Sequence, residues 1–255
     1  MIGWRAPALI AAALVLGGAA PESPVLVPEV SQHAIHVEQG FTGADLLLYG
    51  AILTGEGQPV EGDYDIVVVV EGPSRAVTVR EKRKVAGIWV NADSNRFRSA
   101  PGFYAVAASR PVGEIVDPRT AAIYELGLKF LQLSPIGSID PEREAPFARG
   151  LVAHMMRTGL YQEDDHAVTI SHKVLYQARI TLPSSVPIGD YTAETFAIRD
   201  GRVVASETTR IRVDKQGFAR LIAERAQHAG FAYGLVAVAL SVAMGWIAGR
   251  LFARV

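Results

Sequence analysis

The sequence predicts a mainly β protein: an immunoglobulin-like β-sandwich with a helical insertion, followed by one C-terminal transmembrane helix. Short apolar runs separated by Gly- and Pro-containing turns fill residues 31–110 and resume after residue 168, as expected for strands of a sandwich core. Residues 111–165 instead carry apolar side chains at helical spacing,. Residues 229–249 carry no charge, and as a helix they would be about 31 Å long, enough to cross a bilayer core of about 30 Å. Two small β modules in place of one sandwich are the alternative.

The N-terminal segment, residues 1–20, has the layout of a secretory signal peptide. Arg5 precedes an apolar run that ends in Gly17-Gly18-Ala19-Ala20, the order of charge and hydropathy that such signals have. Cleavage after Ala19 fits as well as cleavage after Ala20. In either case residues 21–214 are predicted to be exported as a periplasmic β-rich domain.

Strands are expected throughout the first half of this domain. The segment Ala76–Val85 alternates in polarity, so Arg80, Lys82 and Lys84 share one face of a regular strand,. Trp89 is a large apolar side chain and is expected to fill the sandwich core. The expected strands are Asp45–Thr54, Tyr64–Glu71, Ala76–Val85, Gly87–Asn91 and Phe103–Ser109.

Two helices are expected in the insertion, residues 111–165. The first is Pro118–Leu133, in which Pro118 occupies a favourable early position,. The second is Pro146–Tyr161, which Gly159 is expected to close,. Proline and glycine residues between the two segments separate them,.

Strands then resume and lead to the C-terminal helix. Asp200-Gly201 is the strongest short hairpin signal in the chain,. Residues 215–228 place apolar side chains on one helical face and are expected to form a juxtamembrane helix that runs into the span,. The expected strands are Val168–Ile170, Val174–Leu182, Asp190–Arg199 and Arg202–Val213.

The predicted transmembrane helix, residues 229–249, sets the predicted topology. Arg250 and Arg254 follow it in a short tail, residues 250–255, and such basic residues favour the cytoplasmic side. The sequence therefore predicts a single-pass protein of the inner (cytoplasmic) membrane, with its N-terminal domain in the periplasm and its C-terminus in the cytoplasm.

Small residues form a stripe along this predicted helix. They recur at every fourth position, a spacing that lets helix backbones approach closely where lipid removes the hydrophobic driving force. We expect the stripe to pack against a second copy of the chain or against a helix of another membrane protein. Its members are Ala237, Ser241, Gly245 and Gly249.

Several phrases, in this order and spacing, resemble the alphaproteobacterial putative transmembrane protein family (Alph_Pro_TM). The resemblance extends over nearly the whole mature chain. It implies a membrane-anchored protein and supplies no activity and no functional residues. Proteins of this family are loosely associated with neighbouring proteins of the sulfite-exporter type, and this association implies an inorganic anion as the substrate of a partner or as a ligand. The phrases are Gly40-Phe41-Thr42-Gly43, Tyr49-Gly50-Ala51, Ala86–Asn91, Phe103–Ala107 with Ser109-Arg110-Pro111, Gly159-Leu160-Tyr161, and Leu182-Pro183 with Val186-Pro187, Gly189 and Tyr191.

Composition argues against several kinds of chemistry. The chain has no cysteine, which excludes disulfides, thiolate nucleophiles and cysteine-bound metals. Its net charge of −1 gives no case for nucleic-acid binding,. Its six histidines form no close pair of metal-binding spacing, and no nucleotide-binding or hydrolase motif is present,. We therefore expect no catalytic residue, no metal and no cofactor.

Charge is unevenly distributed along the exported part. Residues 21–74 contain nine acidic residues and no Lys or Arg, whereas residues 75–98 have a net charge of +5. Side chains two apart in a strand can share one anion, which would relieve their mutual repulsion. The candidate anion-binding residues are Arg75, Arg80, Lys82 and Lys84. The alternative is an edge strand that its lysines protect from aggregation.

The function that these features predict is that of a membrane-anchored periplasmic accessory or binding protein. Its expected partner is an integral membrane protein, such as a transporter of an inorganic anion. The alternatives are an envelope enzyme of unknown reaction and a purely structural envelope protein. An enzyme would need a concave pocket with convergent polar groups of perturbed pKa.

Overall fold

The computed structural model describes residues 24–37, 40–60, 62–136, 141–215 and 230–252. The predicted signal peptide, residues 1–20, lies outside these ranges. So does the predicted juxtamembrane helix, residues 215–228, apart from Lys215, which ends a strand. Of the predicted tail, residues 253–255 also lie outside.

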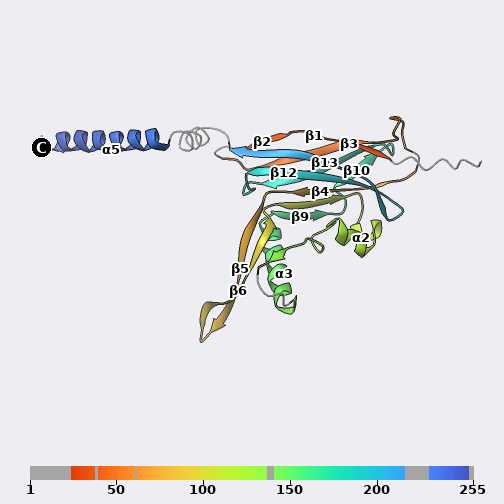
Figure 1. Ribbon diagram of the computed structural model, residues 1–255, viewed down its shortest axis with the longest axis horizontal. Coiled ribbons are helices and arrows are strands. Elements are labelled where there is room, and N and C mark those ends of the chain that lie inside the picture. Colours follow the sequence, from red (N-terminus) through yellow and green to blue (C-terminus); the bar gives the residue numbers. More distant parts are fainter. Residues whose placement is uncertain (1–23, 38–39, 61, 137–140, 216–229, 253–255) are drawn as a thin grey trace, which may run out of the picture.

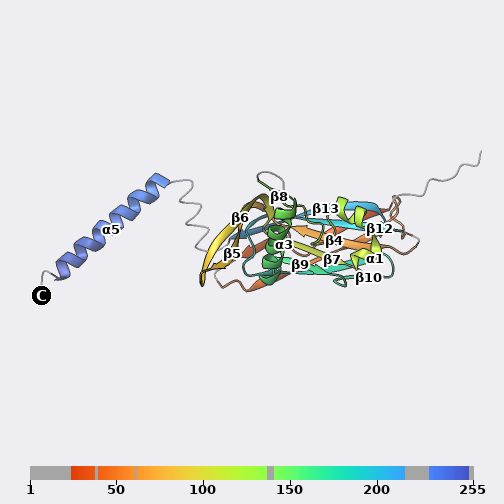
Figure 2. The same ribbon diagram turned by 90° about the horizontal axis from the view of Figure 1, so that it is seen from below.

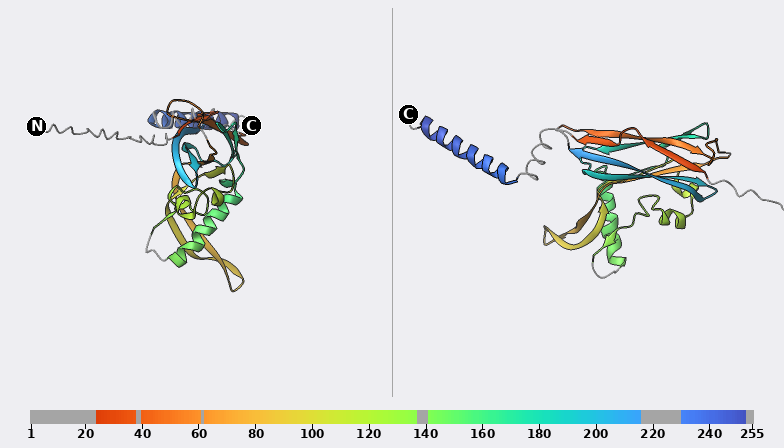
Figure 3. Two further views of the ribbon diagram at one scale, coloured as in Figure 1. Left: turned by 90° about the vertical axis from the view of Figure 1, so that its right-hand side faces the viewer. Right: turned by 45° about the horizontal axis from the view of Figure 1, so that its top comes forward.

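Two β-sheets lie face to face around one hydrophobic core (Figures 1 and 3). The mainly β prediction is confirmed. One sheet has the strand order β1 (Val25–Val30), β3 (Gly43–Leu53), β11 (Leu175–Pro183), β10 (Val168–Ser171). The other has the order β2 (Ala34–Val37), β13 (Arg202–Lys215), β12 (Gly189–Arg199), β4 (Asp65–Glu71), β7 (Tyr104–Ala108), β9 (Tyr161–Asp164).

The burial of each strand follows from what covers its two faces. In β11 every second residue is buried, beginning at Tyr176, because one face meets the core and the other meets solvent. In β4 and β7 consecutive residues are buried. The segment that follows β7 covers the outer face of this part of the sheet. Leu126 in this segment is fully buried, and the ring centroids of Tyr124 and of Phe196 on β12 are 5.4 Å apart.

The predicted hairpin at Asp200-Gly201 joins β12 to β13. Asp200 has φ = 49° and Gly201 has φ = 76°, so both central residues are left-handed, as a tight turn between twisted strands requires. Asp and Gly tolerate this conformation better than most residues do. The prediction is therefore confirmed by geometry as well as by position.

Between β7 and β10 the chain forms helices, but the first predicted helix is much shorter than expected. In place of Pro118–Leu133 the structure has α2 (Pro118–Ile123), and a further short helix, α1 (Val112–Ile115), precedes it. Glu125 and Gly127 have φ of 51° and 121°, which a right-handed helix cannot contain. The turn carries Leu126 into the core, so burial of this leucine outweighs continuation of the helix.

The second predicted helix is present with a different beginning. Helix α3 runs from Pro141 to Arg157 and contains Pro146, which was expected to be its first residue. Pro146 is the sixth residue of α3, beyond the first four positions that lack an intrahelical acceptor, so its missing N–H removes one hydrogen bond of the helix,. The chain leaves the helix at Gly159, as predicted, with φ = 70°. Leu160 N–H then donates to the carbonyl of Met155 at 2.9 Å. The strand β9 that follows pairs parallel with β7.

A long hairpin projects from one end of the sandwich (Figures 1 and 2). It consists of β5 (Ser74–Val85) and β6 (Ile88–Pro101), and a two-residue strand, β8 (Ser134–Pro135), pairs with the inner part of β6. The expectation that Trp89 fills the core is wrong: Trp89 lies at the end of this hairpin and is 66% exposed. The alternating pattern does specify a strand, but no sheet packs over its outer part.

The C-terminal apolar segment forms α5 (Gly230–Phe252). Ala237, Ser241, Gly245 and Gly249 are exposed along it, and the Ser241 hydroxyl donates to the carbonyl of Ala237 at 2.9 Å. Among the residues described, no helix combines the length and the apolar composition that crossing a membrane requires.

Candidate functional site

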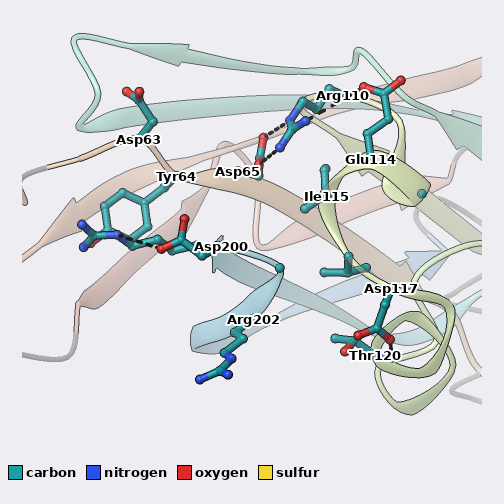
Figure 4. A pocket seen from close by; sticks show the side chains of 14 residues that line it. Asp63, Tyr64, Asp65, Arg110, Glu114, Ile115, Asp117, Thr120, Asp200 and Arg202 are labelled. Atoms are coloured by element: carbon teal, nitrogen blue, oxygen red, sulfur yellow. Dashed lines mark hydrogen bonds and ion pairs between the residues drawn. The ribbon is translucent and has the colours of Figure 1, made fainter.

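An open pocket of about 900 Å³ lies at the end of the sandwich where β12 turns into β13. Its walls come from three connections that lie far apart in the sequence: the start of β4, the segment from β7 into α2, and the turn at Asp200-Gly201 (Figure 4). The cross-strand pairs Ile198–Asp65 and Val67–Ala108 bring these three connections to the same end of the sheet. The pocket is therefore a product of sheet topology.

One wall of the pocket is fixed by an ion pair between Asp65 and Arg110. The guanidinium donates to both carboxylate oxygens, at 2.8 and 2.7 Å, and the Ser109 hydroxyl donates to the same carboxylate at 3.1 Å. Two-point contact of this kind fixes orientation as well as distance. Asp65 raises the pKa of Arg110, so that guanidinium stays charged. Glu114 approaches it from the other side at 3.9 Å.

A second arginine covers Tyr64 on the opposite wall. Arg199 donates to the Tyr64 hydroxyl at 3.0 Å, and its guanidinium carbon lies 5.3 Å from the ring centroid. Gly62 leaves room for it, because a Cβ there would lie 2.9 Å from the guanidinium. The Asp200 carboxylate is 3.9 Å from Arg199 and is largely exposed. Arg199 is therefore held by a cation–π contact and a hydrogen bond to the same tyrosine,.

Asp117 and Arg202 complete the polar lining. The Asp117 carboxylate accepts the backbone N–H of Thr120 at 2.8 Å and so caps α2,. That N–H lowers the pKa of Asp117. Arg202 begins β13 and is exposed. The pocket lining has five acidic and three basic side chains, so it favours a polar or basic segment over a free anion.

Sequence reasoning missed this pocket. Its residues form no motif, since they come from three separate connections. Two weak signals were present in the sequence: the Asp200-Gly201 turn, and the Ser109-Arg110-Pro111 phrase at the end of a predicted strand.

The candidate anion-binding residues lie elsewhere, on the projecting hairpin. Arg75, Arg80, Lys82 and Lys84 all belong to β5 and are exposed. Arg75 stands at the base of the hairpin, opposite Ala100, whereas the other three lie in its outer half. Within the same half, Arg83 pairs with Glu81 at 3.2 Å. The structure places these cations on one arm and apart from the pocket at the other end.

No group of three or more metal-binding side chains occurs in the described part of the chain. Three neighbouring side chains of α3 have metal-binding atoms: Met155 is buried against the core, whereas His154 and Met156 are exposed. Adjacent positions of α3 therefore point in different directions, as the helical geometry requires.

A cluster of carboxylates beneath the helical segment was also not anticipated. Glu71 lies across from Tyr104 and Thr192 on the neighbouring strands. Burial raises the pKa of Glu71, nearby Glu125 raises it further, and a hydrogen bond from Ser74 opposes the rise. Burial alone raises the pKa of Glu194. These carboxylates are therefore more costly to ionise in the folded protein than in the unfolded chain.

This cluster predicts a pH dependence of stability. Because the folded pKa of Glu71 lies above its unfolded value, stability should be greatest below the unfolded pKa and should fall as pH rises through the folded pKa,. Glu71→Gln should therefore raise the free energy of unfolding at neutral pH, measured by urea denaturation, by about 0.5–1 kcal/mol after allowance for solvent screening, and should flatten the dependence of this free energy on pH. The exposed Glu56→Gln is the control; equal effects of the two substitutions would contradict the assignment.

The fold and the pocket define a class of protein: a β-sandwich domain with an open polar pocket, followed along the chain by an apolar helix. A family model described as Putative transmembrane protein (Alph_Pro_TM) matches residues 25–254. The chain belongs to this family, as the resemblance in the sequence indicated. The search of curated proteins gave no match.

Proposed function

We propose that the protein is a single-pass, membrane-anchored envelope protein that binds a partner through the pocket at the far end of its β-sandwich. The observation that carries the proposal is the position of the pocket relative to the end of β13. The turn at Asp200-Gly201 lines the pocket, whereas Val213, near the end of β13, pairs with Gly189 at the opposite end of the sheet. The chain thus leaves towards α5 from the end remote from the pocket, roughly 36 Å away along the strand.

The anchor in this proposal is α5, supported by the uncharged run of residues 229–249 and by the family's description as a transmembrane protein. The signal-like residues 1–20 support export of the sandwich to the periplasm, and Arg250 and Arg254 support a cytoplasmic C-terminus,. With this orientation the pocket faces away from the membrane that holds the chain.

An immunoglobulin-like arrangement of the sandwich is part of the proposal. Three features support it: the order β1-β3-β11-β10 opposite β2-β13-β12-β4-β7, the parallel pairing of β2 with β13, and the hydrogen bond from the Tyr191 hydroxyl to the carbonyl of Pro187. The last resembles the tyrosine corner of such sandwiches. In these domains the loops at one end form the binding surface, and the pocket occupies loops at one end here.

Binding, not catalysis, is the proposed use of the pocket. Asp65 and Arg110 neutralise each other, Asp117 caps a helix, and Arg199 is held against Tyr64. A catalytic acid or base needs a poised pKa and a free path to substrate. We propose that the partner is an integral membrane protein, such as an anion transporter, which presents a polar or basic segment to the pocket and a helix to the stripe on α5.

Reporter fusions test the topology on which this function depends. Alkaline phosphatase fused after Val213 should be active, because it would be exported, and the same enzyme fused after Val255 should be inactive. A cytoplasmic reporter fused at the same two positions is the control and should give the opposite activities. Activity of the Val255 fusion alone would overturn the proposed anchoring.

Capture of the full chain in mild detergent tests the partner. An integral membrane protein should co-purify with the parent protein. Glu114→Gln with Asp200→Asn should weaken this capture, since both remove charge from the pocket without disturbing the turn, and Glu207→Gln on the exposed edge of β13 is the matched control. Gly245→Ile with Gly249→Ile should abolish capture if the stripe carries the contact. Capture that survives both pairs of substitutions would contradict the proposed contacts.

A further inference from the structure

The end of the β5–β6 hairpin exposes a compact set of large apolar side chains, here called the apolar tip. It consists of Val85, Ile88, Trp89 and Val90, which are 53%, 69%, 66% and 39% exposed. They flank a two-residue turn formed by Ala86 and Gly87, with φ of 48° and 88°. Folding does not bury this apolar surface, so it adds nothing to the stability of the sandwich.

The hairpin holds the tip on a supported stalk. Val77 and Val79 pack partly buried against the core, Phe97 on β6 is 1% exposed, and α3 contacts both strands (Figure 3). From Arg80 onward every residue of β5 is exposed. The inner half is therefore fixed to the body, and the outer half stands clear of it.

Basic side chains lie along the strand that leads to the tip and are here called the basic collar. It consists of Arg80, Lys82, Arg83 and Lys84 on β5. Over residues 75–98 the net charge is +5, with Glu81 and Asp93 as the two acids. Lysines on an edge strand protect against aggregation, which accounts for the collar. The same explanation fails for the tip, because exposed Trp and Ile promote association.

The hairpin leaves the sandwich at the end where the chain departs towards α5. Pro73, which precedes β5, contacts Gly189: a Cβ on this glycine would lie 2.9 Å from the proline ring. Gly189 in turn pairs with Val213 near the end of β13. The base of the hairpin and the exit of the chain therefore lie side by side, as Figures 1 and 2 show. The pocket is at the other end.

We propose that the apolar tip inserts into the headgroup region of an anionic lipid surface, the membrane that holds α5, while the basic collar binds the lipid phosphates. This inference rests on the proposed anchoring. Trp favours the interface between lipid and water, and Lys and Arg beside it bind anionic headgroups. β5 is twelve residues long, about 40 Å when extended. Residues 216–229 can span at most about 50 Å, so the tip and the start of α5 can reach one surface.

The lipid surface accounts for both parts of the arm, which a free anion does not. A free anion would use the collar and leave Trp89 and Ile88 in water. In this proposal, the anion that Arg80, Lys82 and Lys84 bind is a lipid phosphate. Arg75, at the base of the hairpin, lies outside the proposed contact.

Fluorescence of Trp89 in the full chain tests the proposal. Trp4→Phe and Trp246→Phe leave Trp89 as the single tryptophan. The protein is reconstituted in vesicles of equal parts phosphatidylcholine and phosphatidylglycerol, with and without bromine on the acyl chains. Brominated lipid should quench Trp89, and pure phosphatidylcholine should give much less quenching. Arg80→Gln, Lys82→Gln and Lys84→Gln together should shift the equilibrium between inserted and free tip by about 100-fold, since each basic residue contributes about fivefold.

Matched variants and controls separate the remaining outcomes. Ile88→Ser should reduce quenching, whereas Ile123→Ser on α2 should not, although Ile123 is also exposed, at 63%.

Protein that floats with vesicles but keeps Trp89 accessible to acrylamide would overturn the tip proposal and leave the anchor standing. Protein that fails to float would overturn the anchoring itself. If inorganic phosphate alone changed Trp89 emission equally, the ligand of the basic collar would be a free anion. If Trp89 were shielded from acrylamide only after envelope proteins were added, the apolar tip would bind a protein. Either result would overturn insertion into lipid.

Discussion

Replacing Gly50 by alanine is expected to lower the melting temperature of the protein by about 6–12 °C. A Cβ at this position would lie 2.4 Å from the carbonyl oxygen of Val27 on β1 and 2.5 Å from the hydroxyl of Tyr176 on β11. The first contact is backbone of a paired strand, and the second belongs to a ring that is 2% exposed in the core. Neither can move freely, so overpacking should cost about 3 kcal/mol.

Two further variants make this expectation specific. Gly55→Ala is the control, since a Cβ there meets nothing within 4 Å, and it should change stability by less than about 0.5 kcal/mol. Tyr176→Phe in the Gly50→Ala background should recover part of the loss, because it removes the closest side-chain atom. Thermal unfolding of the full chain in mild detergent, followed by near-UV circular dichroism, measures all three. A Gly50→Ala protein that melts with the parent would show that β1, β3 and β11 do not pack in this way.

Truncation of Tyr191 should lower the free energy of unfolding by a similar amount. This loss has two parts, one from the hydroxyl and one from the ring. The ring is 1% exposed and contacts Phe103 with centroids 5.9 Å apart, and its hydroxyl donates to the carbonyl of Pro187 at 2.6 Å. Tyr191→Phe should cost about 1–2 kcal/mol, because the carbonyl loses its buried donor. Tyr191→Ala should cost about 4 kcal/mol, because it also leaves a cavity.

Tyr191 is important because it holds the connection between the two sheets. β11 ends in one sheet and β12 begins in the other, and the hydrogen bond to Pro187 fixes the chain as it crosses. Tyr49→Phe is the control, since Tyr49 is 42% exposed. Urea unfolding of each variant gives the free energies. If Tyr191→Phe and Tyr49→Phe were equally mild, the hydroxyl would have no part in the crossing.

Local sequence patterns identified most of the strands. The runs around Leu46, Val68 and Phe196 become buried strands of the two sheets, because a period-2 pattern or a continuous β-branched run restricts the backbone wherever the strand is placed. The hairpin at Asp200-Gly201 was equally accessible, since its left-handed φ values depend on the two residues themselves,.

Predictions that depended on distant contacts were less successful. The helix expected over Pro118–Leu133 ends at Ile123, because Leu126 is drawn into a core that the local periodicity does not contain. Trp89 was expected inside the sandwich and lies outside it. Its pattern specifies a strand, but whether a sheet covers that strand is decided by residues elsewhere in the chain.

The same distinction applies to the functional surfaces. The cations of β5 could be read from the sequence, because strand alternation places Arg80, Lys82 and Lys84 on one face. The pocket around Asp65, Arg110 and Arg199 could not, because three connections meet there only after β4, β7 and β12 have paired.

The sequence by itself determined the β-rich class, the positions of most strands, the apolar C-terminal helix and the basic character of β5. These follow from interactions between residues a few positions apart. Only the tertiary structure decided that the β5–β6 hairpin leaves the sandwich with its apolar tip uncovered, and that the polar pocket lies at the end remote from the chain exit. Both depend on strand pairing over long sequence separations, as in the contact of Pro73 with Gly189. Such contacts are selected by the packing of the whole core and are therefore not encoded in any local pattern.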